Sequence, residues 1–219
     1  MREIVIDTET TGLDPATGHR IVEVGCVELD NHVRTDRVFQ TYLNPEREIP
    51  PEAFAIHGLS KEFLIDHPRF EEVVDPFLDF LGDSTIIAHN AEFDIGFINS
   101  ELENISYPTL TAIEVIDTVR LARQKFPGMP ASLDALCRRF GIDTSSREKH
   151  GALLDAELLA DVYLELLGGR QPALELTKAH PTHGINQVVK SPRPHTASAS
   201  ELAAHAAFMS DFDDPFWQR

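Results

Sequence analysis

The stretch Ile4-Val5-Ile6-Asp7-Thr8-Glu9-Thr10-Thr11-Gly12 decides the fold expected for this chain. It begins as an apolar, β-branched run, which is typical of a buried strand, and it ends in a Thr-Thr-Gly turn. Because side chains alternate along a strand, Asp7 and Glu9 project from the face that also carries Val5. Two carboxylates so close repel each other, and a hard divalent ion such as Mg²⁺ or Mn²⁺ between them removes that cost. An edge strand with two solvated acids is the alternative for this short pattern.

The sequence around this strand predicts a meander of strands followed by alternating strands and helices. The first strand covers about residues 3–8, and apolar alternation predicts two more over 20–30 and 34–43, joined by a tight turn at Asn31-His32. Residues 50–64 are expected to form a loop with a short helix. Further helices are predicted over 70–81, 91–102, 117–126, 132–140 and 151–167, with short strands at 85–88 and 112–116, and with Asn90 as a helix N-cap. This order predicts an α/β fold with a mixed sheet flanked by helices.

Bulk properties exclude several classes of protein. The chain has 219 residues, 42% of them hydrophobic, which is enough for one globular domain plus an appendage. No apolar run is long enough to span a bilayer, and the N-terminus lacks the form of a secretory signal. Cys26 and Cys137 each lie in an apolar stretch and are expected to be reduced core thiols. We therefore expect a cytoplasmic protein with no membrane partner.

The net charge is −17, from 36 acidic against 19 basic residues. Such a charge argues against an unaided grip on a nucleic-acid backbone, which needs a basic surface. The segment from Arg170 onward has five residues of each sign, so the part before it carries the whole excess of acids. If that part handles a phosphate backbone, bound metals or a partner protein must supply the attraction.

Two further acids lie where a helix is expected to be buried. Asp94 falls within the apolar stripe of the helix over 91–102, and Asp155 heads the apolar stripe of the helix over 151–167. Taken singly, Asp94 is also compatible with capping a turn and Asp155 with a favourable helix N-terminus. His150 lies just ahead of the last helix, where a general base that activates water should sit.

Three motifs in this order resemble those of the DEDDh family of 3′–5′ exonucleases, which have an RNase H-like fold. They are Asp7-x-Glu9-Thr-Thr-Gly, His89-Asn-x-x-Phe-Asp94 and His150-x-x-x-x-Asp155. The resemblance covers about Arg2 to Leu167. It is greatest to the proofreading subunits of bacterial replicative DNA polymerases, on the segments 53–58, 126–128, 132–137 and 150–156.

The resemblance implies a role for each matching position. Four acids would hold two Mg²⁺ or Mn²⁺ ions, with the first of them bridging: Asp7, Glu9, Asp94 and Asp155. His150 would deprotonate the attacking water. His89 would contact other residues of the site and neither the metal ions nor the substrate. The residues expected near the terminal nucleotide are Asp7, Thr8, Glu9, the turn 10–12, Leu13, Glu52, His57 and Asp155.

The C-terminal part differs in composition, and we expect a 3′–5′ exonuclease domain over 1–169 followed by a flexible tail over 170–219. The tail is rich in Pro, His, Ala, Ser and Thr. By resemblance to the family, a segment at about 171–176 (Gln171, Leu174, Leu176) would bind a sliding clamp. The segment at about 185–219 (with Phe208, Phe212, Phe216 and Trp217) would bind the polymerase alpha subunit. The alternative is a disordered tail with incidental aromatic residues.

The function expected from these features is proofreading: removal of mispaired 3′-terminal nucleotides delivered by a polymerase as a single-stranded or frayed DNA end. Mispaired ends unpair more cheaply, which is one source of selectivity. One alternative is a stand-alone exonuclease on RNA ends or short oligonucleotides, against which the tail argues. A catalytically inert binding module is the other, and the intact set of acids with His150 argues against it.

Overall fold

The central strand of the computed structural model is β1 (Arg2–Thr10), and the model describes residues 1–145, 149–169 and 196–210. The chain divides into two compact units, Met1–Leu174 and Glu175–Arg219, which are described separately. The first unit contains one five-stranded sheet in the order β3-β2-β1-β4-β5. The other strands are β2 (Ile21–Asp30), β3 (Val33–Tyr42), β4 (Thr85–Ala88) and β5 (Val115–Asp117).

The sheet is mixed, as the sequence predicts. β1 pairs antiparallel with β2, and β2 pairs antiparallel with β3, which together form the expected meander. On its other side β1 pairs parallel with β4, and β4 pairs parallel with β5. The central strand is therefore hydrogen-bonded along both edges, which fits its uninterrupted apolar start.

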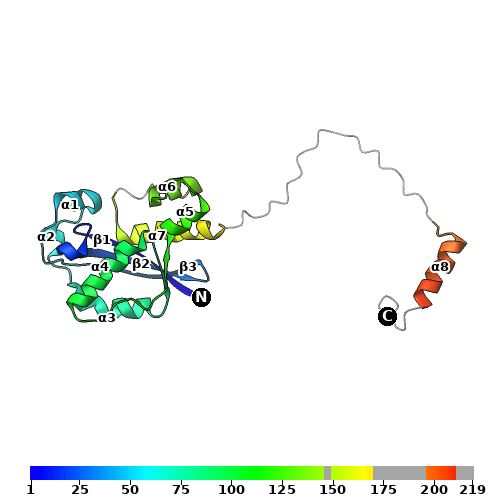
Figure 1. The fold of residues 1–219 in the computed structure, drawn as a ribbon, viewed down its shortest axis with the longest axis horizontal. Coiled ribbons are helices and arrows are strands. Elements are labelled where there is room, and N and C mark those ends of the chain that lie inside the picture. Colours follow the sequence, from blue (N-terminus) through cyan, green and yellow to red (C-terminus); the bar gives the residue numbers. More distant parts are fainter. Residues whose placement is uncertain (146–148, 170–195, 211–219) are drawn as a thin grey trace. The chain divides into compact units, whose positions relative to one another are not determined.

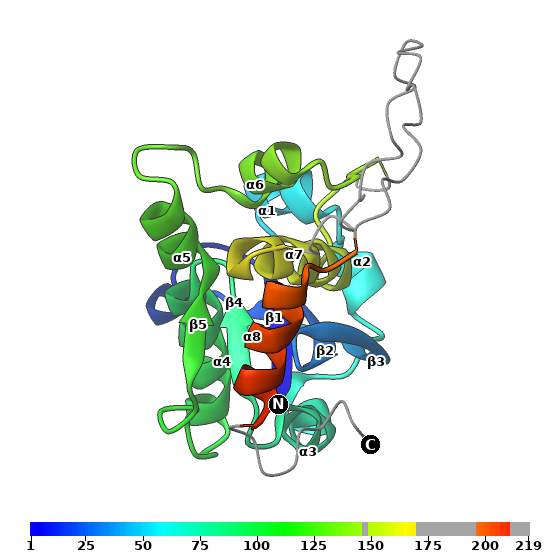
Figure 2. The same cartoon turned by 90° about the vertical axis from the view of Figure 1, so that its right-hand side faces the viewer.

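Helices cover both faces of the sheet, and Figures 1 and 2 show α3 on the opposite side of the strands from α6 and α7. One core packs α3 (Phe70–Leu81) and α4 (Ala91–Asn104) against β1 residues such as Ile4 and Ile6. The other core packs α5 (Thr118–Lys125), α6 (Leu133–Phe140) and α7 (Ala152–Leu167) against Val5. Two short helices, α1 (Pro51–His57) and α2 (Lys61–Leu64), occupy the segment expected to be loop and short helix.

Most predicted elements are confirmed, and two details differ. Asn90 is the N-cap residue of α4, as predicted, but its backbone is left-handed (φ 71°) and its side chain makes no capping hydrogen bond. The strand expected over 112–116 is instead β5 at Val115–Asp117, because β4 offers only Ile86–Ala88 for pairing and residues 111–112 form a turn. Both cysteines are buried in the core, as expected.

The described part of the second unit contains α8 (Ala199–Ser210), a helix without buried residues. Phe208 lies on it with an exposed side chain. The other predicted partner-binding residues lie outside the described residues: Gln171, Leu174, Leu176, Phe212, Phe216 and Trp217. Across the described ranges, no helix combines the length and the apolar character that crossing a membrane requires.

Candidate active site

The C-terminal end of β1 presents its polar side chains to both faces of the sheet. Glu9 points to the face covered by α7, where it approaches His150 and Asp155. Thr8, one residue earlier, points to the opposite face, where its hydroxyl donates a hydrogen bond of 2.7 Å to Asp94 of α4. The alternation that the sequence predicts for this strand therefore distributes the site over both layers of helices.

The first turn of α7 is held against β2 by two residues that sequence reasoning did not single out. A Cβ atom on Gly25 would lie 2.2 Å from the backbone nitrogen of Leu153, so only glycine permits this approach. The buried carboxylate of Glu23 accepts a hydrogen bond of 3.1 Å from the backbone N–H of Ala152. Gly25 is also the register partner of Asp7, so this contact brings the start of α7 beside the acids of β1.

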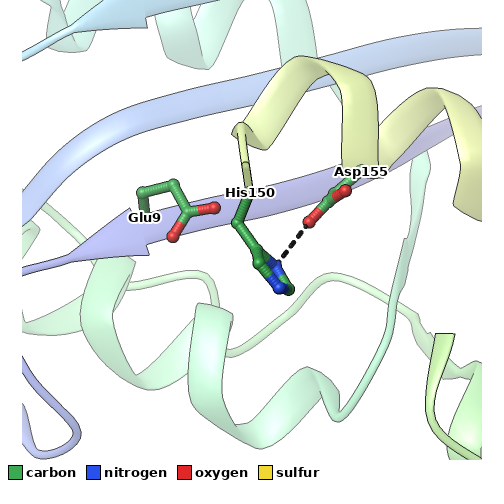
Figure 3. A group of neighbouring side chains, drawn as sticks. All are labelled: Glu9, His150 and Asp155. Carbon is green, nitrogen blue, oxygen red and sulfur yellow. Dashed lines mark hydrogen bonds and ion pairs between the residues drawn. The ribbon is translucent and has the colours of Figure 1, made fainter. Parts of the chain in front are cut away.

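Three side chains converge on this junction (Figure 3): Glu9, His150 and Asp155. One ligand atom from each lies within 4.8 Å of the others. His150 Nδ1 is 3.1 Å from Asp155 Oδ2, and the backbone N–H of His150 donates to Ile56 O at 3.4 Å. Asp155 is buried, whereas the side chain of His150 is 47% exposed. A half-exposed imidazole beside buried carboxylates is suited to exchanging a proton with a water molecule.

Asp94 is 3% exposed, and burial raises the pKa of its carboxyl group to about 7, although the hydrogen bond from Thr8 opposes that rise. Within the described ranges no lysine or arginine forms an ion pair with it. A buried carboxylate of this kind has a costly charge unless a cation accompanies it. Asp94 is not one of the three residues that meet within 4.8 Å, so its link to them runs through β1.

Two cavities open on either side of these acids. One, of about 850 Å³, is lined by Asp7, His150 and Asp155 together with residues of α5 and the start of α6. The other, of about 640 Å³, extends from Thr8 and Glu9 past the Thr-Thr-Gly turn to α1. The remaining residues that the sequence predicts near a terminal nucleotide line this second cavity: Leu13, Glu52 and His57. The sequence-predicted set is thus divided between two adjoining hollows.

Two histidines near the site form hydrogen bonds through Nδ1. The backbone N–H of Leu59 donates to Nδ1 of His57, so the neutral ring carries its proton on Nε2. Nδ1 of His89 lies 2.9 Å from the Thr118 hydroxyl, which also lies 3.1 Å from Ala88 O. Burial is the main cause that lowers the pKa of both rings, which favours their neutral forms.

Comparison with known proteins assigns the class. Residues 4–163 match the family described as Exonuclease. Exonuclease X in complex with 5′ overhanging duplex DNA superposes with a TM-score of 0.61 at 28% identity, over 75% of this chain and 90% of that one. The nuclease domain of 3′hExo, a DEDDh family member bound to rAMP, has a TM-score of 0.65 at 21% identity, over 76% and 91% of the two chains, and shows the shared fold.

Relatives along nearly the whole chain define the branch within this class. The DNA polymerase III subunit epsilon of Rickettsia felis is 49% identical over 96% of both chains. The subunit of the same name from Escherichia coli is 42% identical over 94% of this chain and 91% of its own. The chain therefore belongs to the exonuclease family, in its branch of DNA polymerase III epsilon subunits. It is an enzyme, a metal-dependent 3′–5′ exonuclease with a proofreading function.

Proposed function

We propose that Asp7, Glu9, Asp94 and Asp155 hold two divalent ions, Mg²⁺ or Mn²⁺, with Asp7 between them. The donor set supports this, because it consists of carboxylate oxygens, most of them buried, which suit a hard cation. Two such ions, when bound, stabilise negative charge on the attacking and leaving oxygens of an in-line displacement at phosphorus. The single observation that carries the proposal is the convergence of Glu9, His150 and Asp155 from β1 and the start of α7.

His150 acts as the general base in this proposal. An ionised Asp155 can only accept a hydrogen bond, so Nδ1 of His150 carries a proton and donates it to Oδ2. Nε2 is then the nitrogen that takes the proton from the attacking water. The hydrogen bond between the His150 backbone and Ile56 ties this base to α1, which carries Glu52 and His57.

The second cavity receives the 3′-terminal nucleotide. Leu13, at its edge, is 83% exposed and offers an apolar surface to the last base. Glu52 offers a carboxylate acceptor to the sugar end of that nucleotide, and His57 lines the same cavity with its Nε2 atom buried. Thr8 and the turn over 10–12 line the same cavity beside Glu9, and the backbone N–H of Thr11 donates to Arg20 O at 2.9 Å.

The test is hydrolysis of a 5′-labelled single-stranded DNA, and of a primer with a 3′ mismatch, in Mg²⁺, Mn²⁺ or EDTA. We expect stepwise shortening from the 3′ end in either metal, faster release of a mismatched than of a paired end, and no product in EDTA. Products shortened from the 5′ end, or undiminished hydrolysis in EDTA, would contradict the proposal.

Replacing His150 with glutamine should reduce the rate by roughly 10²–10⁴-fold, the usual contribution of a general base. Metal affinity, measured by titration calorimetry, should change little, because His150 is proposed as a base and not as a ligand. His67→Gln removes an imidazole that lines neither cavity and should keep the parental rate. Loss of metal binding in His150→Gln would reassign the residue as a ligand.

The raised pKa of Asp94 predicts how stability depends on pH without metal. The folded protein holds this proton up to about pH 7 and the unfolded chain only to about pH 4, so stability falls as pH rises between the two values. We expect the Tm in EDTA to drop by several degrees from pH 5.5 to 7.5, since about 1 kcal/mol changes Tm by roughly 2–4 °C in a domain of this size.

Divalent metal should reverse that drop, because a bound cation stabilises the charged carboxylate. Asp94→Asn should flatten the dependence in EDTA, whereas Asp79→Asn, which alters an exposed acid of α3, should retain it. An Asp94→Asn protein with the same pH dependence as its parent would show that burial does not hold the proton on Asp94.

We further propose that the protein works in the cytoplasm as a subunit of the replicative polymerase. The names of its relatives place them in DNA polymerase III, and partner binding would compensate for the net charge of −17. The domain over 1–169 carries the nuclease. In the tail over 170–219, the segment 171–176 binds the sliding clamp and the segment 185–219 binds the polymerase alpha subunit.

A further inference from the structure

The segment over residues 118–140 is basic in an otherwise acidic chain. It carries five lysines or arginines against one acid, whereas the whole chain has a net charge of −17. It comprises α5, α6 and the connection between them, and α6 lies beside α7 in Figure 1. A local excess of positive charge in such a protein marks the part of its surface best suited to a phosphate backbone.

Two of these basic residues, Lys125 and Arg139, make contacts within the protein. The ammonium group of Lys125 donates to the carbonyl oxygens of Glu165 and Leu166 at the end of α7, at 3.1 and 2.9 Å. The guanidinium of Arg139 stacks over the Phe126 ring, 4.5 Å from its centroid. These contacts account for the presence of Lys125 and Arg139 without any ligand.

Arg120 and Arg123 differ, because both line the 850 Å³ cavity that contains Asp7, His150 and Asp155. They are three residues apart on α5, so they lie on one face of the helix with Cβ atoms about 5–6 Å apart. Arg120 is 77% exposed and reaches Asp117 only at 3.7 Å, and Arg123 has no ion pair within the described ranges. Both guanidinium groups are therefore available to a ligand in this cavity.

The composition of the two cavities sets a direction for the strand. The two arginines are the only lysines or arginines among the described residues that line the first cavity, and no described lysine or arginine lines the second. The second cavity, beside Leu13, is assigned to the last base. Because Asp7, His150 and Asp155 line the first cavity, we place the preceding nucleotides there, where Asp117 and Asp134 would repel their phosphates without a compensating charge.

We propose that Arg120 and Arg123 bind the backbone phosphates of the strand on the 5′ side of the scissile bond. Arginine is suited to this role because its planar guanidinium donates two hydrogen bonds to one phosphate. The pair positions the strand for hydrolysis, and it lets a strongly acidic enzyme hold a short single strand. This inference rests on the active site proposed above and names how that site engages the rest of its substrate.

The test compares two substrates that differ in upstream phosphates, using the full chain. A dT12 oligonucleotide has them, and the p-nitrophenyl ester of thymidine 5′-monophosphate has none. In the variant Arg120→Ala/Arg123→Ala, the ratio of kcat/KM for dT12 to that for the ester should fall roughly tenfold or more. The loss should appear mainly in KM. Arg138→Ala, which removes an exposed base of α6 outside the cavity, should keep the parental ratio.

Binding provides a second readout that does not depend on hydrolysis. Fluorescence anisotropy of labelled dT12, with Ca²⁺ in place of Mg²⁺, should show weaker binding by the double variant. Each single-strand phosphate contact contributes about 0.7 to the slope of log affinity against log salt, so losing two should reduce that slope by about 1.4. Arg120→Lys/Arg123→Lys should retain the slope and part of the affinity.

Several results would overturn the inference. They are an equal loss on both substrates, an equal effect of Arg138→Ala, or a double variant that binds dT12 with the parental affinity and salt slope. Failure of the proposed function looks different. In that case the parent hydrolyses neither substrate, while its affinity for dT12 still depends on Arg120 and Arg123.

Discussion

Replacing Asp7 with alanine should abolish hydrolysis of single-stranded DNA while the fold persists. Asp7 lies at the end of the central strand, half-buried, on the wall of the cavity that it shares with His150 and Asp155. In the proposed mechanism it contacts both ions, so its loss removes the arrangement that stabilises charge on the attacking and leaving oxygens. Activity in Mg²⁺ should fall to the background of the assay.

The same substitution should leave the metal-free protein as stable as the parent, or more stable. Asp7 adds negative charge to a group of acids that includes Glu9 and Asp155, and removing one charge relieves their mutual repulsion. The Tm in EDTA should hold or rise, and the stabilisation by Mg²⁺ should shrink. Asp36→Ala removes an exposed charge from β3 and should keep full activity. An Asp7→Ala protein that melts well below its parent in EDTA, or that retains near-normal activity, would count against the site.

The fold was predictable where local signals and burial agree. The helix over 70–81 and the strand over 85–88 have the predicted bounds, because their apolar spacing coincides with the faces that pack into the core. The prediction failed where contacts between elements distant in sequence determine the local structure. The bounds of β5 depend on which residues of β4 remain to pair with, and the left-handed backbone of Asn90 depends on how β4 joins α4. A single sequence encodes neither in a local pattern.

The candidate site was predictable as a set of residues but not as an arrangement. Acids on buried faces mark Asp94 and Asp155 in the sequence, and both are indeed buried. That Thr8 binds Asp94 from the opposite face of β1 follows from strand alternation only once α4 is placed. Gly25 and Glu23 escaped notice because their roles, close approach of α7 and a cap on its first turn, arise from contacts distant in sequence. A glycine within an otherwise apolar strand was the one signal available.

Cutting the chain after Gly169 should abolish co-purification with the polymerase while hydrolysis of short single strands stays near normal. The described site residues all precede this point, and the first compact unit extends only to Leu174. The amino-acid composition changes at Gly169. The segment after it has equal numbers of acidic and basic residues, so the nuclease part carries the whole net charge of −17. A tether that holds the nuclease near the primer end raises its effective concentration there, which an acidic domain needs more than a basic one.

Single substitutions in the full chain test the proposed alpha-subunit contact and the proposed clamp contact separately. Phe216→Ala and Trp217→Ala should weaken binding to the alpha subunit, measured by surface plasmon resonance, because aromatic anchors contribute a large share of interface energy. Gln171→Ala should weaken binding to the sliding clamp and leave the alpha-subunit affinity unchanged. Leu202→Ala alters an exposed apolar side chain of α8 and shows whether that helix takes part. If the truncated protein co-purified with the polymerase at full yield, the catalytic domain itself would hold the partner, and the tail would have no role in assembly.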